Sequence, residues 1–233
     1  MKFRKIFSLL AGLVAFSGAH AAPIQLNTGV ASGGATLASG SIDPFWSIST
    51  NGINFSAAKV AYPGAYPDFN SGQTCCGMGT VSAGAAWITT PSVVATSPTT
   101  GWGIGNTVYA RKLFDLSGYD LSTVSLSGKW RVADADYGIY VNGNLISGTN
   151  THAFAFAQDQ TFSLSMGSGF FVGGINAIEL RGQSVNNVWD AFWLAGTVQG
   201  QNTPTSTSVP EPATLALLGL GLAGMVGSRR RRS

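Results

Sequence analysis

The chain has 233 residues, of which 13 are Lys or Arg and 10 are Asp or Glu, for a formal net charge of +3. Only 10% of the residues are charged, 45% are hydrophobic and 31 are Gly. This length suits one domain with accessory segments, and the composition excludes both a coiled coil and an acidic disordered tail.

The positive charge is concentrated at the two ends of the chain. Residues 22–208 carry six basic and nine acidic residues, a net charge of −3. The other basic residues are terminal: Lys2, Arg4, Lys5, Arg229, Arg230, Arg231 and Arg232. A protein that binds nucleic acid needs a basic face to neutralise phosphates, so we expect no nucleic-acid partner.

The N-terminus has the organisation of a secretory signal peptide. A basic start precedes an apolar run over residues 6–16, and Ala19 and Ala21 form an A-x-A cleavage pattern. Cleavage after Ala21 leaves Ala22-Pro23 as the new start. Residues 1–21 are therefore predicted to be a helical signal peptide that signal peptidase removes on export.

The C-terminus has three parts after a polar, flexible linker over residues 200–208. Val209-Pro210-Glu211-Pro212 comes first, the apolar stretch 213–227 follows, and the cluster Arg229–Arg232 ends the chain. An apolar helix of that length spans roughly 22 Å, less than the roughly 30 Å of a bilayer core. Arginine side chains can snorkel, so the segment can enter the membrane with its arginines on the cytoplasmic side.

Residues 209–233 closely resemble the PEP-CTERM sorting signal of Gram-negative bacteria that make exopolysaccharide. The resemblance implies that Pro210, Glu211 and Pro212 are recognised by an exosortase, a membrane cysteine transpeptidase that removes the tail. It further implies export, a transient anchor in the inner membrane, and delivery to the cell envelope or the extracellular polysaccharide matrix. Two prolines keep the segment extended, as a processing enzyme requires.

The body, residues 22–199, is predicted to be a single all-β domain, an antiparallel β-sandwich. Asn142-Gly143 predicts a tight hairpin with a type I′ turn. Short alternating runs separated by turn residues predict strands. The predicted strands are Trp46–Thr50, Ala85–Thr89, Thr107–Phe114, Thr123–Val132, Tyr137–Val141, Asn144–Ile146, Gln160–Leu164, Asn176–Arg181 and Ala191–Val198.

Three segments of the body resemble galactose-binding-like jelly rolls. Residues 126–143 are similar to a hairpin of those domains, residues 173–180 to their G-x-N-x-I/L strand, and residues 191–196 to a closing strand. The resemblance implies a jelly-roll architecture. Such domains often bind carbohydrate, and many are purely structural.

Asp134 and Asp136 are two residues apart, so on a strand they would project from the same face. Solvated or turn-capping carboxylates are the leading interpretation. A Ca²⁺ site, a sugar contact and a catalytic carboxylate pair are the alternatives. Apart from Ca²⁺, we expect no cofactor.

Six tryptophans are many for a body of this size. Trp46, Trp87 and Trp130 lie in strand-like sequence and are predicted to fill the core. Trp102 and Trp189 lie in loop-like sequence and are candidate surface platforms for sugar stacking. His152, the one histidine outside the signal peptide, is predicted to be an exposed loop residue.

Cys75 and Cys76 are adjacent. A strained vicinal disulfide is the leading interpretation, because export favours oxidation. Bridges to a second chain and two reduced thiols are the alternatives. A redox C-x-x-C motif does not occur.

The sequence thus favours a non-enzymatic exported protein that an exosortase sorts to the cell envelope or matrix. A carbohydrate-binding module of the extracellular matrix is the alternative. A glycoside hydrolase or lyase would depend on Asp134 and Asp136 alone.

Overall fold

The computed structural model describes residues 20–61, 84–92, 101–153, 158–185 and 190–203. The chain divides into two compact units, residues 1–202 and 203–233, and Thr203 alone of the second unit is described. Residues 1–19 of the predicted signal helix, the predicted sorting helix, Cys75, Cys76 and Trp189 lie outside the described residues. Within the described ranges, no helix is long and apolar enough to cross a membrane.

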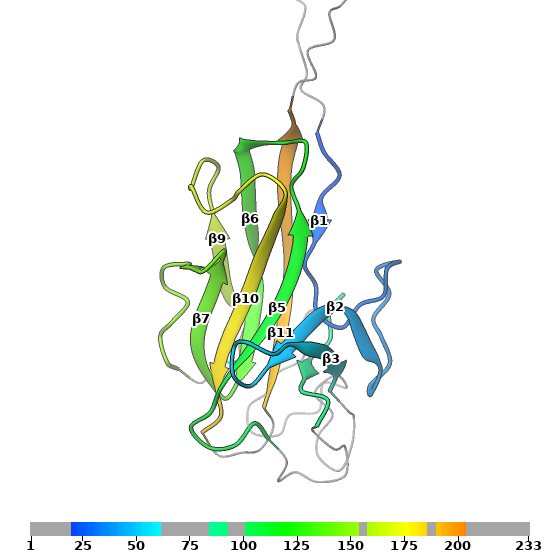
Figure 1. The fold of residues 1–233 in the computed structure, drawn as a ribbon, viewed down its shortest axis with the longest axis vertical. Helices are drawn as coiled ribbons and strands as arrows, with labels where there is room; N and C mark the ends of the chain where they lie inside the picture. Colours follow the sequence, from blue (N-terminus) through cyan, green and yellow to red (C-terminus); the bar gives the residue numbers. More distant parts are fainter. Residues whose placement is uncertain (1–19, 62–83, 93–100, 154–157, 186–189, 204–233) are drawn as a thin grey trace, which may run out of the picture. The chain divides into compact units, whose positions relative to one another are not determined.

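The regular elements of the described residues are all strands (Figure 1). They are β1 (Ile24–Gln25), β2 (Ile42–Ser49), β3 (Ser56–Val60), β4 (Ile88–Thr89), β5 (Thr107–Asp115), β6 (Tyr119–Ala133), β7 (Ala135–Val141), β8 (Asn144–Leu145), β9 (Gln160–Leu164), β10 (Ile175–Gln183) and β11 (Ala191–Asn202). The prediction of an all-β fold is confirmed.

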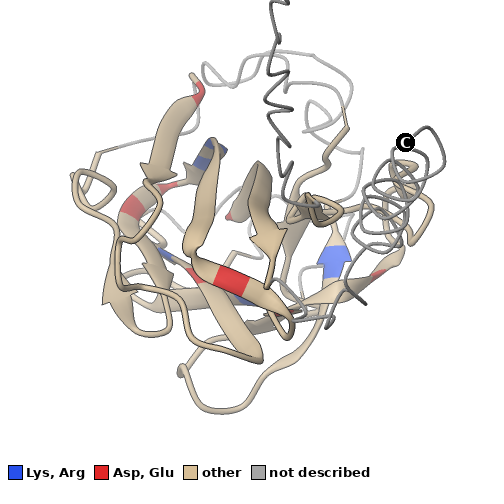
Figure 2. Ribbon diagram, turned by 90° about the horizontal axis from the view of Figure 1, so that it is seen from above, with Lys and Arg blue, Asp and Glu red and all other residues tan. Residues whose placement is uncertain are grey.

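The strands form one antiparallel sheet in the order β8-β7-β10-β5-β2-β3-β4-β11-β6-β9, and β1 also pairs with β11. The sheet curls, so that β7, β10 and β5 lie over β6, β9 and β11 (Figure 1). Figure 2 shows from above how the strands surround a common interior. Two layers therefore face each other as in a sandwich, while β3 and β4 keep the hydrogen bonding continuous between them.

The interior is filled by aromatic and aliphatic side chains from both layers. Trp46 and Trp130 are each 1% exposed, which confirms their predicted place in the core. Trp87 is also fully buried, but it belongs to a second cluster with Trp193 and four alanines. Replacing a buried side chain of this size by Ala typically costs about 3–5 kcal/mol.

Along strands β5 and β10, side chains point alternately into the interior and toward the outer face of the sheet. On β5, Val108, Ala110 and Phe114 are buried, while on β10 the buried residues include Ile178 and Leu180. The intervening side chains are less buried and lie on the outer face of the sheet. This regular pattern brings a defined set of polar and aromatic residues together on the outside of the domain.

The predicted Asn-Gly hairpin joins β7 to β8. Asn142 and Gly143 have φ angles of 50° and 81°, both in the left-handed region that a type I′ turn requires. The Asn142 side chain also accepts a hydrogen bond from Ala177 N at 2.9 Å and donates to Asn176 Oδ1 at 2.7 Å. The turn is thereby fastened to β10.

The two ends of the domain lie side by side. Ala21 N donates to Gly200 O at 3.2 Å, Leu26 N donates to Gly196 O at 2.8 Å, and Thr28 N donates to Leu194 O at 2.9 Å. Strand β11 continues to Asn202 and so includes the first three residues of the predicted linker.

Gly128 on β6 lies where a larger residue has no room. A Cβ at this position would lie 2.5 Å from Ala195 O and 2.7 Å from Gly196 Cα. We expect Gly128→Ala to lower the free energy of unfolding by about 1–3 kcal/mol, because neighbouring backbone must shift. Chemical denaturation measures the loss. Gly33→Ala is the control, since a Cβ there meets nothing within 4 Å, and equal stability of the two variants would contradict the prediction.

Candidate functional site

Asp134 and Asp136 lie at the junction of β6 and β7, and both are buried. Asp134 Oδ2 accepts a hydrogen bond from Val185 N at 3.1 Å. Asp136 accepts from Ala153 N at 2.7 Å and from Thr151 Oγ1 at 2.8 Å. The two carboxylates are therefore not solvated, and each ties a following segment of the chain to the sheet.

The structure gives these two carboxylates a role in holding the backbone. Within the described ranges, no three His, Cys, Asp or Glu side chains come together in a group that could hold a metal ion. His152 is exposed as predicted, with its ring centroid 4.4 Å from that of Tyr137.

Asp190, at the start of β11, is a buried acid that the sequence analysis missed. Its Oδ2 accepts a hydrogen bond of 2.6 Å from Trp102 N, and its Oδ1 has no hydrogen-bond partner among the described residues. Burial and, to a smaller extent, the nearby charge of Asp134 raise the pKa of Asp190 to about 7, against the opposing effect of the hydrogen bonds from Trp102 and Ser184. A carboxyl in this state changes its ionisation near neutral pH.

The prediction that Trp102 lies on the surface is wrong. Its side chain is 5% exposed and stacks on Phe192 with ring centroids 4.7 Å apart. Trp102 Nε1 donates to Thr89 Oγ1 at 3.4 Å, while Asp190 holds the backbone of the same residue. These contacts with Phe192, Thr89 and Asp190 hold the Gly101-Trp102-Gly103 segment against the domain. The buried indole ring of Trp102 therefore offers no platform for a sugar.

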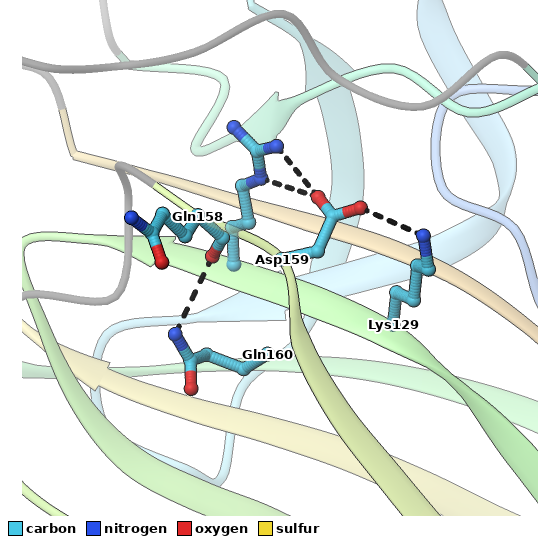
Figure 3. Close-up of polar contacts among 5 residues, drawn as sticks. Lys129, Gln158, Asp159 and Gln160 are labelled. Carbon is cyan, nitrogen blue, oxygen red and sulfur yellow. Dashed lines mark hydrogen bonds and ion pairs between the residues drawn. The ribbon is translucent and has the colours of Figure 1, made fainter.

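A depression of about 500 Å³ lies over β6 and β9. Four hydroxyl side chains and one ammonium group line it, those of Ser127, Lys129, Ser147, Thr161 and Ser163. Beside it, Asp159 bridges two cations: its Oδ2 lies 3.1 Å from Lys129 Nζ and its Oδ1 lies 2.6 Å from Arg131 Nη2 (Figure 3). The cations on this side are thus already paired.

A second cavity, of about 380 Å³, lies between the N-terminal segment and the ends of β2 and β5. Lys112 lines it and donates from Nζ to Gln25 O at 3.0 Å. Burial lowers the pKa of Lys112, against the opposing charge of Asp43. Asp43 itself accepts hydrogen bonds from the backbone of Gly29, Phe45 and Trp46. Its pKa is raised by burial.

The outer face of β7, β10 and β5 carries a cluster that we call the arginine–tyrosine face: Tyr109, Arg111, Tyr140, Glu179 and Arg181. Strand register sets Glu179 opposite both Arg111 and Tyr140, and Arg181 opposite Tyr109. None of these five residues was singled out as a site from the sequence. Their proximity depends on pairing between strands about 30 to 70 residues apart, which no local motif reports.

We expect the unfolding free energy to fall as pH rises from about 4 to about 7 because of Asp190. Its folded-state pKa of about 7 lies above the unfolded value near 3.9, so the folded state binds more protons in this window. The decline has an upper limit of about 1.4 kcal/mol per pH unit and ends above the folded pKa. Asp190→Asn keeps a side-chain oxygen for Trp102 N and cannot ionise, so this variant should lack that decline in urea denaturation series from pH 4 to 8.

Asp115→Asn is the control for this experiment. Hydrogen bonds from Ser117 lower the pKa of this exposed carboxyl, the opposite of the shift at Asp190. The control variant should keep the decline between pH 4 and 7. Identical pH profiles for the original chain and Asp190→Asn would refute the role given to Asp190.

Comparison with known proteins assigns the C-terminal segment. Residues 208–232 match the model of the PEP-CTERM protein-sorting motif, which includes Pro210, Glu211, Pro212 and the arginine cluster. A search of the curated proteins finds no match. These sorting residues lie outside the described part of the chain. The chain therefore carries a PEP-CTERM protein-sorting motif, which indicates an exported protein that an exosortase sorts to the cell envelope.

Proposed function

We propose that this chain delivers a non-enzymatic β-domain to the outer cell surface or the extracellular polysaccharide matrix of a Gram-negative bacterium. The observation that carries the proposal is the sorting motif at residues 208–232. Signal peptidase removes residues 1–21, the apolar segment anchors the chain in the inner membrane for a time, and an exosortase then removes the tail. The proposed role needs no cofactor.

The environment of the acidic residues supports a non-enzymatic role. A glycosidase needs two carboxyls that reach the substrate, one of them as a general acid. Asp134 and Asp136 are instead 4% and 2% exposed and accept hydrogen bonds from backbone N–H groups. Carboxylates held in this way stabilise the domain and leave little access for a glycosidic bond.

Carbohydrate binding is the second candidate, and the arginine–tyrosine face favours it. The face presents guanidinium groups and aromatic rings on rigid strands, which are side chains able to contact a polymer without enclosing it. The buried Trp102 does not support sugar stacking at the position first considered. A binding role would therefore depend on the sheet surface.

The sorting part of the proposal is tested on protein recovered from the envelope and medium of producing cells. Mass spectrometry should show a chain that begins at Ala22 and lacks Arg229–Arg232. Deletion of Pro210–Ser233 should leave export intact and abolish delivery to the surface, because the exosortase has nothing to recognise. Pro210→Ala with Pro212→Ala should show the same loss with the apolar segment retained.

Thr205→Ala with Thr207→Ala, in the preceding linker, is the matched control and should be sorted normally. Surface protein that still carries Arg229–Arg232 would contradict removal of the tail. Normal surface delivery of the variant without Pro210–Ser233 would contradict the sorting role itself.

A further inference from the structure

The arginine–tyrosine face is built by strand register. Because Tyr109 and Arg111 alternate with the buried residues of β5, and Glu179 and Arg181 with those of β10, all four project from the outer side of the sheet. Tyr140 joins them from β7, opposite Glu179. The five side chains thus lie on three neighbouring strands, so their relative positions are fixed by backbone hydrogen bonds.

Arg181 is held between two tyrosine rings. Its guanidinium carbon lies 3.6 Å from the ring centroid of Tyr140 and 5.4 Å from that of Tyr109. Arg181 Nε donates to Glu179 Oε1 at 2.7 Å. Arg181 is thus ion-paired with Glu179 through Nε, and within the described structure its terminal Nη groups donate no hydrogen bond. The side chain is 31% exposed, so these donors remain available.

Arg111 has a similar aromatic support and, among the described residues, no counter-ion. Its guanidinium carbon lies 3.6 Å above the ring centroid of Phe55. The Nε atom is shielded from solvent and has no hydrogen-bond partner, and the described residues place no carboxylate within ion-pair distance of this guanidinium. Glu179 faces Arg111 across the strands but is paired with Arg181. The face therefore holds two cations and one anion.

Two pre-oriented guanidinium groups suit carboxylates in particular. The planar fork of Arg matches a carboxylate with two parallel hydrogen bonds, and such charge-assisted bonds are roughly twice as strong as neutral ones. Stacking on rings already restricts both side chains, so less entropy is lost when a ligand binds. The aromatic edges beside them can contact the apolar C–H groups of a sugar.

The spacing of the two arginines suits an extended ligand. Arg111 and Arg181 are diagonal neighbours across β5 and β10. The Cα atoms of such a diagonal pair typically lie about 7–8 Å apart. None of the five residues of the arginine–tyrosine face lines either of the two cavities described above. A ligand with repeated carboxylates that lies along the sheet would reach both guanidinium groups, whereas a small molecule would find no enclosing walls.

We propose that the arginine–tyrosine face binds an acidic polysaccharide through its uronate carboxylates, with Arg111 and Arg181 as the two anchors. This inference rests on the proposed function, since it names the matrix component that the delivered domain contacts. Charge complementarity selects this ligand over a neutral glycan. Glu179 orients Arg181 through their ion pair. The negative charge of Glu179 also repels the carboxylates of the polysaccharide and so limits the affinity for it.

The test measures binding of the full chain, purified in mild detergent, to immobilised polygalacturonate and to immobilised neutral dextran. We expect binding to polygalacturonate that weakens with added salt, and none to dextran. Arg111→Gln and Arg181→Gln should each weaken binding about tenfold, and the double variant about a hundredfold. Lys59→Gln with Lys129→Gln removes the same charge from β3 and β6 and should change binding less than about threefold.

Arg111→Lys and Arg181→Lys keep the charge without the fork and should bind between the original chain and the Gln variants. Circular dichroism shows whether the Gln variants are folded. If they are not, the binding of the two Lys variants tests the proposal. Three results would overturn the proposal: no binding to polygalacturonate at low salt, equal binding to dextran, or equal losses in the arginine and lysine pairs.

The same double arginine variant separates this inference from the proposed function. In producing cells it should be processed and delivered like the original chain and then be retained less by the matrix. Equal matrix retention of the two chains would overturn the binding site while leaving sorting intact. Failure of the original chain to reach the surface would overturn the proposed function and leave polygalacturonate binding in solution unaffected.

Discussion

The first four residues of strand β11, Ala191–Leu194, are buried on both faces of the sheet, and the rest of the domain depends on this burial. Phe192, Leu194 and Val198 pack into the main interior, while Trp193 packs into the second cluster on the opposite side. One edge of β11 pairs with β6, and the other pairs with β4 and β1. Segments from the start, middle and end of the chain therefore meet at this strand.

Local patterns predict most of the strands but not their arrangement. The alternation in residues 107–114 and 176–181 and the Asn142-Gly143 turn are read directly from neighbouring residues. Strand β3 was missed because Ser56–Val60 has two alanines and a lysine among its five residues, with little β propensity. Strand β1 was missed because it has only two residues and exists through its partner.

The candidate sites show the same limit more strongly. Asp190 is buried, and its backbone hydrogen-bond donor is Trp102, 88 residues away in the sequence. The arginine–tyrosine face requires Arg181 to meet Tyr109 and Tyr140, which only the register of three strands brings about. Sequence reasoning identified the sorting residues because that motif is contiguous, and it missed sites assembled by tertiary pairing.

The net charge of the body gives a misleading impression of its surface. Four of its described carboxyl groups are buried and bonded to backbone N–H groups, those of Asp43, Asp134, Asp136 and Asp190. Lys112 and Arg131 are also buried. The remaining described charges, four acids and four bases, balance each other, so a polyanion that approaches the domain meets no general repulsion.

The exit of the chain from the end of β11 also decides how the domain responds to mechanical load. Residues 191–202 pair along β6 through most of their length, with bonds roughly perpendicular to the strand direction. A pull on the C-terminal end that is opposed at the far end of β6 acts along β11 and loads these bonds in shear, so that many must break together instead of one after another. A domain tethered through this strand is therefore suited to resist extension.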